Sequence, residues 1–498
     1  MPPAKGGGME IFMQTTKIAH ATPFSGVPKI NLASVFGASP QKPFLLRIPA
    51  TGERPMQFAA ENLPEGLKLE GNIISGSIAE EGNYEVTLIA ENALGKASKQ
   101  LVLEIAPNNS IVTPLLGFTT WNAFAQHVTQ KNVSDSAKNM VKYGLTEYGY
   151  RYINIDSGWQ HQYGGEFDAI QPNHKFPDMK GLTDEIHSLG LKCGIYSTPM
   201  LTAWGCPNEF SSIPGCTLGD PDIRFADTNG GIGIIRKEKN NAKQWEAWGF
   251  DYLKYDWKPT DPVNAELMRQ ELIKLNRDFG FCVTVQALPE YGNYWSKYCN
   301  SFRNNEDSLG CWSRLLETFD SYLIHQNATT KGHYFDLDML DVGNCVFAHK
   351  ENFLTKDEMI VAYSLRAFLN SPIQISSVLD NISDFEMDLY CNEEIIAINQ
   401  DTAFSRPVLI FQKEGNLYVF EKQLEDGTLG YAFFNFGESE EMFTANFTEQ
   451  STLRDVWLKE DIGTMDTLSL AMSRHTVRII KSPKMLQHDY PITVLNKQ

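Results

Sequence analysis

A lysine and an aspartate near the middle of the chain have the types and spacing that acid–base or nucleophilic chemistry requires. In the stretch DYLKYDWKP (251–259), a run typical of a buried strand ends with Lys254 and Asp256 two residues apart. Side chains alternate between the two faces of a strand, so we expect this pair on one face. Because buried charge is costly unless it is paired, the two residues form either a structural ion pair or part of a reactive site.

Polar residues end several other candidate strands as well. The set is Asp156, Tyr196, Lys254, Asp256, Arg303, Asp307 and Asp338. Solvent at strand ends explains one or two such residues, but a set spread over several strands indicates a shared site. The sequence has no metal-binding histidine motif, no CxxC pair and no phosphate-binding glycine loop, so we expect acid–base and nucleophilic catalysis without a metal or nucleotide cofactor.

Two carboxylates on either side of one bond, with aromatic platforms nearby, are the arrangement that glycoside hydrolysis uses. One carboxylate attacks the anomeric carbon, and the other protonates the leaving oxygen and later activates water. In this interpretation Lys254 keeps Asp256 ionised, since a nearby cation lowers a carboxyl pKa. Asp307 would need a raised pKa so that it can act as an acid.

The segments that carry these residues alternate between strand and helix over 112–402. The candidate strands are 115–122, 149–158, 191–199, 250–258, 281–287, 301–307, 333–340 and 371–376. Helical patterns separate many of them, for example at 133–149 and at 181–190, where the final glycine is a candidate C-cap. Eight strand–helix units predict a (β/α)8 barrel with its active site at the C-terminal ends of the strands, and a doubly wound open sheet is the alternative.

Short strands broken by turns flank this region on both sides. Residues 10–107 alternate apolar and polar positions and predict a β-sandwich, and a polar linker follows at 106–110. Residues 405–498 predict a second, antiparallel β-sandwich without residues suited to catalysis. We therefore expect three domains, with the chemistry in the middle one.

Composition and cysteine usage limit the possible partners. The 498 residues carry a formal net charge of −18 and no basic stripe, so neither nucleic acid nor an anionic membrane surface is expected as a partner. No apolar run reaches transmembrane length, and the first residues lack the apolar segment of a signal peptide. Eight cysteines in a chain of this length do not make a disulfide scaffold, and the spacing of Cys206 and Cys216 suits either a loop-closing disulfide or free thiols.

Several stretches resemble the α-galactosidase and α-N-acetylgalactosaminidase family of retaining glycosidases, family 27. In chain order, over 113–403, they are GFTTWNAF, NIDSGW, GLKCGIYS, YLKYDW, YCNSFRNNED, DLDMLDVGN and EEIIAINQD. The resemblance implies the barrel, the C-terminal sandwich and a carbohydrate substrate. The N-terminal sandwich is an addition, similar to the Ig-like modules of bacterial surface and polysaccharide-degrading proteins. The family is mostly secreted, lysosomal or periplasmic, so we expect a periplasmic or extracellular bacterial protein. The sequence does not indicate an oligomeric state.

Carried over position by position, the resemblance also implies roles for individual residues. Asp256 is expected to be the nucleophile and Asp307 the general acid/base. The expected binding residues are Trp121 under the apolar face of the sugar, Asp156 and Lys254 at the hydroxyls around C3, C4 and C6, Tyr196 on the pocket wall, Arg303 near the C2 hydroxyl, and Asp338 at the end of the seventh strand.

Some positions depart from the family pattern. Ser157 stands where the family has a second aspartate, so one hydroxyl contact is shortened or lost. Ala287 replaces a glutamate that contacts O2, as in the N-acetylgalactosaminidases, yet Glu290 stands where those enzymes carry a small residue. Two cysteines that the family uses in disulfides are Lys258 and Gln286 here.

Retaining, exo-acting hydrolysis of terminal α-D-galactosyl residues is therefore the expected function. The same chemistry on another sugar is an alternative, and the protein would then be an α-N-acetylgalactosaminidase, a β-L-arabinopyranosidase or an enzyme of the isomaltodextranase type. Ser157 argues against the arabinopyranosidase, which excludes the C6 group with a bulkier residue. A non-catalytic carbohydrate-binding protein is the alternative from another class, and the presence of both Asp256 and Asp307 argues against it.

Overall fold

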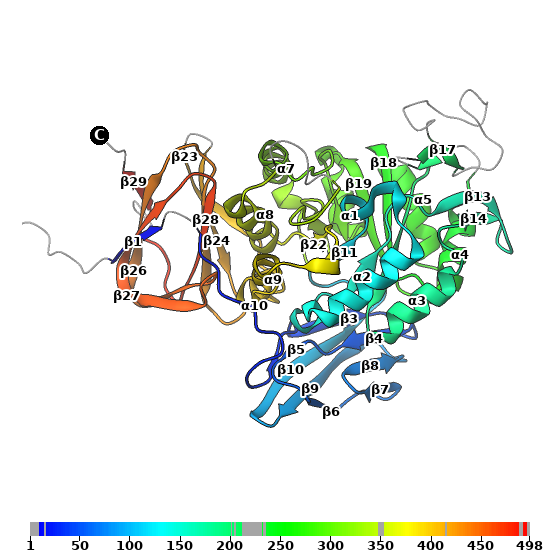
Figure 1. Cartoon of the computed structure of the whole chain (residues 1–498), viewed down its shortest axis with the longest axis horizontal. Coiled ribbons are helices and arrows are strands. Elements are labelled where there is room, and N and C mark those ends of the chain that lie inside the picture. Colours follow the sequence, from blue (N-terminus) through cyan, green and yellow to red (C-terminus); the bar gives the residue numbers. More distant parts are fainter. Residues whose placement is uncertain are drawn as a thin grey trace, which may run out of the picture. The chain divides into compact units, whose positions relative to one another are not determined.

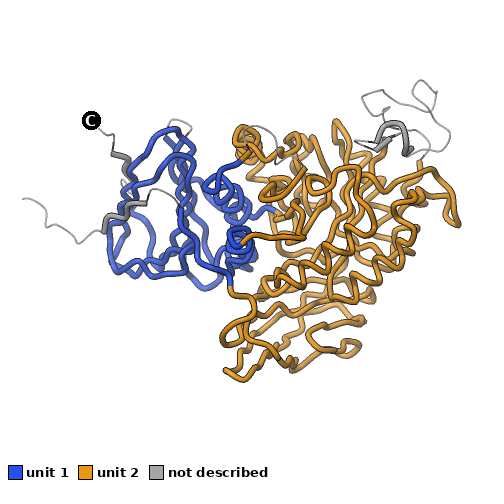
Figure 2. The backbone as a smooth tube through the Cα atoms, viewed as in Figure 1, with its two compact units in different colours: residues 1–21, 354–371, 384–498 blue, residues 22–353, 372–383 orange. Residues whose placement is uncertain are grey.

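The computed structural model describes residues 9–13, 16–200, 202–203, 206–211, 232, 236–346, 353–413, 416–487 and 492–495. Figure 2 shows that the chain forms two compact units. One unit comprises residues 22–353 and 372–383, and the other comprises residues 1–21, 354–371 and 384–498. Cys216 and the side chain of Cys206 lie outside the described residues, so their pairing stays a prediction.

An eight-stranded parallel sheet forms the middle of the first unit. Its strands are β11 (Leu116–Thr119), β12 (Tyr152–Asn154), β15 (Lys192–Ser197), β18 (Tyr252–Thr260), β19 (Gly280–Ala287), β20 (Ser301–Phe302), β21 (Tyr334–Phe335) and β22 (Ile373–Ile375). Each strand overlaps one predicted segment, and the strands follow one another in chain order, with β22 beside β11. A parallel bridge from Leu340 to Ile375 joins the segment after β21 to β22, so the sheet curls round on itself. The prediction of a barrel-type parallel sheet is confirmed, and the open-sheet alternative is wrong.

Helices alternate with these strands and lie around the sheet in Figure 1. They are α1 (Trp121–Phe124), α2 (Gln130–Lys142), α3 (Met179–Ser188), α4 (Glu238–Trp248), α5 (Pro262–Leu272), α6 (Gly292–Tyr298) and α7 (Trp312–His325). Thr129 and Asn132 form a capping box at the start of α2, and Asp178 caps α3. Gly190 follows α3 with a φ of 75°, the left-handed conformation that the predicted C-cap requires. No helix among the described residues is both long and apolar enough to span a bilayer.

Connecting segments contribute shorter elements to the same unit. They are η1 (Ala125–His127), η2 (Leu145–Tyr148), β13 (Gln160–Gly164), β14 (Ala169–Pro172), β16 (Thr202–Ala203), β17 (Cys206–Ser211), η3 (Pro289–Tyr291), η4 (Gln326–Ala328) and η5 (Leu379–Asn381). The barrel strands themselves are buried on both faces; β11 and β12, for example, are buried at every position. This is the expected pattern for a parallel sheet covered by helices, and it explains why the strands read as continuous apolar runs.

Two sheets precede the barrel in the chain and share one apolar core. Their strands are β3 (Val35–Ala38), β4 (Phe44–Arg47), β6 (Gln57–Glu61), β7 (Leu67–Glu70), β8 (Ile73–Gly76), β9 (Gly82–Asn92) and β10 (Gly95–Ile105), and a short pair is formed by β2 (Lys29–Ile30) and β5 (Ala50–Thr51). The sheet orders are β3-β10-β9-β6 and β4-β8-β7. Ile74, Val86 and Leu103 are completely buried in the common core.

These sheets contact the barrel through residues that precede barrel strands. Glu147, just before β12, is 2% exposed and pairs with Arg47 at 3.2 Å and with Arg54 at 3.1 Å. Asp278, just before β19, accepts a hydrogen bond from the Ser39 backbone N–H at 2.9 Å. Because these positions lie at the N-terminal ends of the strands, the added sheets lie at the barrel face opposite to the strand C-termini.

The second unit contains a largely antiparallel sheet. Its elements are β1 (Met9–Met13), α8 (Lys356–Phe368), α9 (Asp384–Tyr390), α10 (Glu393–Asn399), β23 (Val408–Lys413), β24 (Leu417–Gln423), β25 (Leu429–Asn435), β26 (Glu441–Asp455), β27 (Glu460–Met472), β28 (Thr476–Ser482) and β29 (Ile492–Leu495). The predicted C-terminal β-domain is confirmed at this level. The strand β1 pairs in parallel with β27, with Met9 opposite Leu468. Residues 9–13 therefore join the C-terminal sheet, although the predicted N-terminal domain starts at residue 10.

Candidate active site

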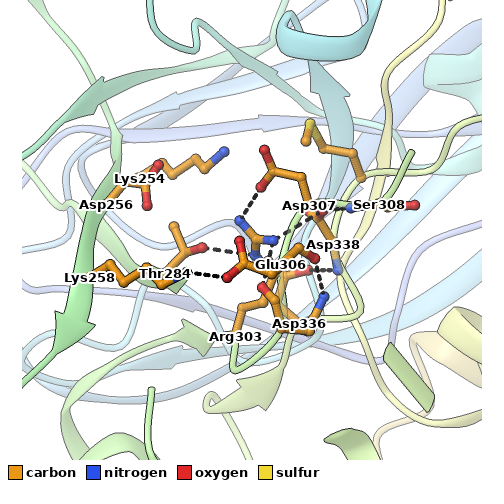
Figure 3. A network of polar contacts seen from close by, with 12 residues as sticks. Lys254, Asp256, Lys258, Thr284, Arg303, Glu306, Asp307, Ser308, Asp336 and Asp338 are labelled. Carbon is orange, nitrogen blue, oxygen red and sulfur yellow. Dashed lines mark hydrogen bonds and ion pairs between the residues drawn. The ribbon is translucent and has the colours of Figure 1, made fainter. Parts of the chain in front are cut away.

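All the predicted site residues lie at the C-terminal ends of barrel strands. Trp121 begins α1 directly after β11, Asp156 follows β12, Tyr196 lies in β15, Lys254 and Asp256 lie in β18, Arg303 and Asp307 follow β20, and Asp338 follows β21. Hydrogen bonds and ion pairs link these residues, except Trp121, in three groups: Asp156 with Lys254, Tyr196 with Asp256, and Arg303 with Asp307 and Asp338. The half-buried Trp121 is placed at the same end of the barrel by its strand. Figure 3 shows part of this polar network.

Asp256 is a buried carboxyl group with one engaged and one unengaged oxygen. The side chain of Tyr196 donates to Asp256 Oδ2 at 3.2 Å, and among the described residues no donor reaches the buried Oδ1. Burial raises the pKa of Asp256 to about 7, although Lys254 and Arg303 act in the opposite direction. Oδ1 of Asp256 is therefore an acceptor without a hydrogen bond from the described residues, and the pKa of the carboxyl group lies near neutral pH.

Lys254 makes its ion pair with Asp156, on a neighbouring part of the barrel. Its Nζ lies 2.7 Å from Asp156 Oδ2, and both side chains are largely buried. Burial alone lowers the pKa of Lys254, but the carboxylates of Asp156 and Asp256 outweigh it and hold the pKa above its ordinary value. Lys254 is thus a permanent cation. The expectation that it keeps Asp256 fully ionised is wrong, because burial of Asp256 outweighs this cation.

Arg303 holds the segment after β20 in place through contacts on several sides. Its guanidinium donates to Thr284 Oγ1 at 2.8 Å, to the Asn305 carbonyl at 2.9 Å and to Asp338 Oδ2 at 3.2 Å. It also donates to Asp307 Oδ1 at 2.8 Å. Since Arg303 is only 2% exposed, these acceptors fix its plane and thereby the position of the carboxyl group of Asp307.

The charge state of Asp307 is the reverse of the one predicted from the sequence. Burial acts to raise its pKa, but the Arg303 guanidinium and Lys254 outweigh it, so the pKa lies below its ordinary value. The prediction of a raised pKa for Asp307 is therefore wrong for this arrangement. When the two carboxyl groups carry one proton between them, that proton resides on Asp256 rather than on Asp307.

Asp338 supports the loop that carries Asp307. Its Oδ2 accepts from Arg303 and also from the backbone N–H of Ser308, at 2.6 Å. Its own N–H donates to Asp336 Oδ1 at 2.8 Å, and its φ of 66° is unusual for a residue with a side chain. Asp338 thus holds both Arg303 and Ser308, on either side of Asp307 along the chain.

Sequence reasoning missed a second set of residues that anchors the same loop. Asn122 Nδ2 donates to the Ser308 carbonyl at 3.2 Å and to Asp341 Oδ1. The Gly310 backbone N–H donates to Asp341 Oδ2 at 3.0 Å. The available signal was position, because Asn122 directly follows Trp121 and Asp341 closes the acidic run DLDMLD.

The departures from the family pattern have distinct surroundings. Ser157 is buried, and its backbone N–H donates to Asp156 Oδ1 at 2.7 Å. Ala287 is completely buried at the end of β19, and its N–H donates to the Arg303 carbonyl at 2.8 Å. The Ala287 backbone therefore lies beside that of Arg303, the residue expected near the C2 hydroxyl, whereas Glu290 is exposed. Lys258 forms an ion pair with Glu306 instead of the family's disulfide.

Comparisons with known proteins agree with this architecture. The model of the alpha galactosidase A family matches residues 113–226 and 214–401. Alpha-galactosidase A of Cellvibrio japonicus is 28% identical over 413 residues, covering 75% of this chain and 92% of that protein. A Bacteroides fragilis structure assigned to the alpha-galactosidase/melibiase class superimposes with a TM-score of 0.83 at 27% identity, covering 93% of this chain and 99% of the other.

A fungal enzyme of the same kind matches about three quarters of the chain. Alpha-galactosidase I of Mortierella vinacea superimposes with a TM-score of 0.65 at 26% identity, covering 76% of this chain and 98% of its own. Because the family model spans more than half of the chain and includes every strand of the barrel, the match concerns the whole catalytic fold. The chain belongs to the alpha galactosidase A family of glycoside hydrolases.

Proposed function

We propose that this protein is a retaining, exo-acting glycosidase that removes terminal α-D-galactosyl residues from oligo- or polysaccharides by double displacement. The observation that carries the proposal is the environment of Asp256. Its Oδ2 is held by Tyr196, whereas its buried Oδ1 meets no donor among the described residues, which suits an oxygen that attacks carbon. Asp307 lies close enough to affect the pKa of Asp256 and projects from a different strand end (Figure 3).

In the first step Asp256 Oδ1 attacks the anomeric carbon while Asp307 gives a proton to the leaving oxygen. The bond from the anomeric carbon to that oxygen breaks, and a glycosyl ester of Asp256 forms. In the second step Asp307 takes a proton from water, whose oxygen attacks the anomeric carbon and releases Asp256 as a carboxylate. After the first step Asp307 is ionised and can accept the proton from water. After the second step Asp307 is protonated and Asp256 is ionised, as the next first step requires.

Substrate binding must move the shared proton, because the free site favours it on Asp256. A sugar hydroxyl that donates to Asp256 stabilises its anion and lowers its pKa. Separation of Asp307 from the Arg303 guanidinium removes the charge that lowers the pKa of Asp307. Both changes transfer the proton to Asp307, where the leaving group requires it.

The remaining residues are proposed to bind the sugar. Asp156 and Lys254 already form a buried, oriented pair that can accept from and donate to adjacent hydroxyl groups. The indole of Trp121 is proposed to offer an apolar face for the sugar ring, and Arg303 is proposed to contact the C2 substituent. Asp338 is proposed to act through Arg303 and Ser308, since its carboxylate already accepts from both.

Galactose is the proposed sugar because Alpha-galactosidase A of Cellvibrio japonicus and alpha-galactosidase I of Mortierella vinacea, which the chain matches over 92% and 98% of their own lengths at 28% and 26% identity, carry that name. One observation favours a second candidate, α-N-acetylgalactosaminidase. Ala287 has a small, buried side chain, and its backbone N–H donates to the carbonyl of Arg303, the residue proposed to contact the C2 substituent. A bulkier acetamido group needs a small neighbour at that position.

A panel of nitrophenyl glycosides tests both candidates. It comprises the α-D-galactoside, the α-D-N-acetylgalactosaminide, the α-D-glucoside and the β-L-arabinopyranoside. The last three differ from the α-D-galactoside in the group at C2, the configuration at C4 and the absence of C6, respectively. We expect the highest kcat/KM on the α-D-galactoside. A higher value on the acetamido sugar would reassign the substrate, and no turnover of any of them by a folded protein would sink the enzymatic proposal.

We also propose the domain boundaries 10–107, 112–402 and 405–498, with an Ig-like β-sandwich first and an antiparallel β-sandwich last, except that residues 10–13 belong to the C-terminal sheet with which they pair. The two sheets with a common core between residues 30 and 105 support the first assignment. The apolar cluster that includes Val419, Phe433 and Leu470 supports the last. Limited proteolysis, which cuts exposed linkers first, tests these boundaries.

A further inference from the structure

Lys258 and Glu306 form an ion pair between the two chain segments that carry the proposed nucleophile and acid/base. Lys258 lies on β18 two residues after Asp256, and Glu306 directly precedes Asp307. Figure 3 shows the pair reaching from one segment to the other. Its side chains are 38% and 50% exposed, so neither is required to fill the core.

The end of β18 needs such a contact because its pairing with β19 is irregular there. The register shifts between Trp257 and Thr260, and the Thr260 hydroxyl donates to the Trp257 carbonyl at 2.8 Å within the irregular turn. Lys258 lies inside this interval, where the regular sheet hydrogen bonds do not fix the strand. A side-chain contact from Lys258 therefore adds a constraint that the sheet does not supply.

The segment that carries Asp307 is anchored mainly toward other elements. Arg303 ties it to Thr284 and Asp338, Asn305 Nδ2 donates to Thr318 Oγ1 at 3.1 Å, and Ser308 is tied to Asp338. These contacts reach β19, α7 and the end of β21. The Lys258–Glu306 pair adds a link toward β18, the strand that carries Asp256.

We propose that Lys258 and Glu306 are positioning residues for the reaction, which set the approach of the segments bearing Asp256 and Asp307 and cancel each other's charge beside them. The inference rests on the proposed function. A lone Lys258 would stabilise the anionic carboxylates, and a lone Glu306 would destabilise them, whereas the intact pair leaves the net charge near the carboxyl groups unchanged. The proposal therefore predicts effects of opposite sign when each partner is removed alone.

The test compares Lys258→Met, Glu306→Gln, the combination of both, and the charge exchange Lys258→Glu with Glu306→Lys. The pH dependence of kcat/KM is measured on the disaccharide melibiose, whose poor leaving group needs protonation. We expect Lys258→Met to shift the profile to higher pH and Glu306→Gln to lower pH, each by about half a pH unit, since the sites are partly solvated. In each single variant kcat falls about two- to fivefold with little change in KM, because the pair does not hold the sugar.

The combined variant and the charge exchange show whether the pair acts on the reaction through its charges or by holding the two segments in position. Both should return the profile close to that of the unmodified enzyme, and the charge exchange should also restore kcat. Lys138→Met and Glu185→Gln are matched controls, because this pair of similar exposure joins α2 to α3 at 2.6 Å on the outside of the barrel. They should leave both profile and kcat unchanged.

Two outcomes would overturn the inference in different ways. If the unmodified enzyme hydrolyses melibiose but both single variants keep its profile, or shift it in the same direction, the pair is an ordinary surface contact and the proposed function survives. If the unmodified enzyme hydrolyses none of the glycosides, the proposed function fails and the positioning role fails with it.

Discussion

The hydroxyl group of Tyr196 donates to Oδ2 of Asp256 at 3.2 Å and thereby distinguishes the two oxygens of this carboxyl group. Oδ1 meets no donor among the described residues, and in the proposed mechanism it is the oxygen that attacks. Tyr196→Phe removes the donor but keeps the ring, so the Asp256 anion loses one stabilising hydrogen bond. A bond of this kind contributes about 0.5–1.5 kcal/mol, so we expect kcat/KM on the α-D-galactoside to fall about three- to tenfold. An unchanged value would mean that this hydrogen bond does not serve the reaction.

Asp256→Asn should abolish turnover without loss of the fold, because an amide of the same shape cannot form the glycosyl ester. Circular dichroism and gel filtration serve as the controls for folding. Residual activity above one part in a thousand, in a sample free of unmodified enzyme, would exclude Asp256 as the nucleophile.

The same variant should be more stable than the unmodified protein at neutral and alkaline pH. The pKa of Asp256 is about 7 in the folded protein and near 3.8 in the unfolded chain, so the folded state binds more protons between these values. Stability that depends on this group is therefore present at low pH and is lost as the pH rises from about 4 to 7. The asparagine variant lacks this loss, so it should gain of order 2–4 kcal/mol at pH 8.

Urea unfolding of both proteins at pH 4.5 and pH 8 measures this difference directly. The gain should be large at pH 8 and several times smaller at pH 4.5, where Asp256 is protonated in the folded protein. An equal difference at both pH values would show that burial does not raise the pKa of Asp256.

Asp307→Asn should impair hydrolysis in proportion to the basicity of the leaving group. With melibiose, whose leaving oxygen must be protonated, we expect kcat/KM to fall about 10²–10⁴-fold. With a nitrophenyl galactoside the loss of kcat/KM should be much smaller, because nitrophenolate leaves without a proton. Equal losses on the two substrates would argue against the acid role of Asp307.

Much of the fold could be predicted because its signals are local. The barrel strands are short apolar runs, and the proposed site residues stand where those runs end, so their common location follows from a parallel barrel. The partner of β1 could not be predicted, because the run MEIFM contains nothing that specifies β27, more than 400 residues away. Pairing between distant strands depends on the assembled sheet.

The charge states of Asp256 and Asp307 were also predicted wrongly, because they too depend on contacts between distant parts of the chain. Lys254 and Asp256 share a strand face, which suggested a direct pair, but the lysine bonds to Asp156 from another strand end. The pKa of each carboxyl group then depends on burial and on the choice among several cations, neither of which the sequence specifies. Glu306 and Lys258 were likewise 48 positions apart in the chain, and only the fold brings them together.

The stereochemistry of the product provides the final test, because it depends on whether Asp256 or water attacks first. If Asp256 attacks, no water needs to fit between it and the anomeric carbon, and carboxyl separations of roughly 5–5.5 Å suit this case, compared with about 6.5–9.5 Å for inverting enzymes. Two inversions at the anomeric carbon then return the original configuration. Proton NMR of a fresh reaction with an α-galactoside should therefore show the α-anomer first, and the β-anomer should appear only as mutarotation proceeds. Immediate formation of the β-anomer would mean that water attacks in one step, with Asp256 as its general base.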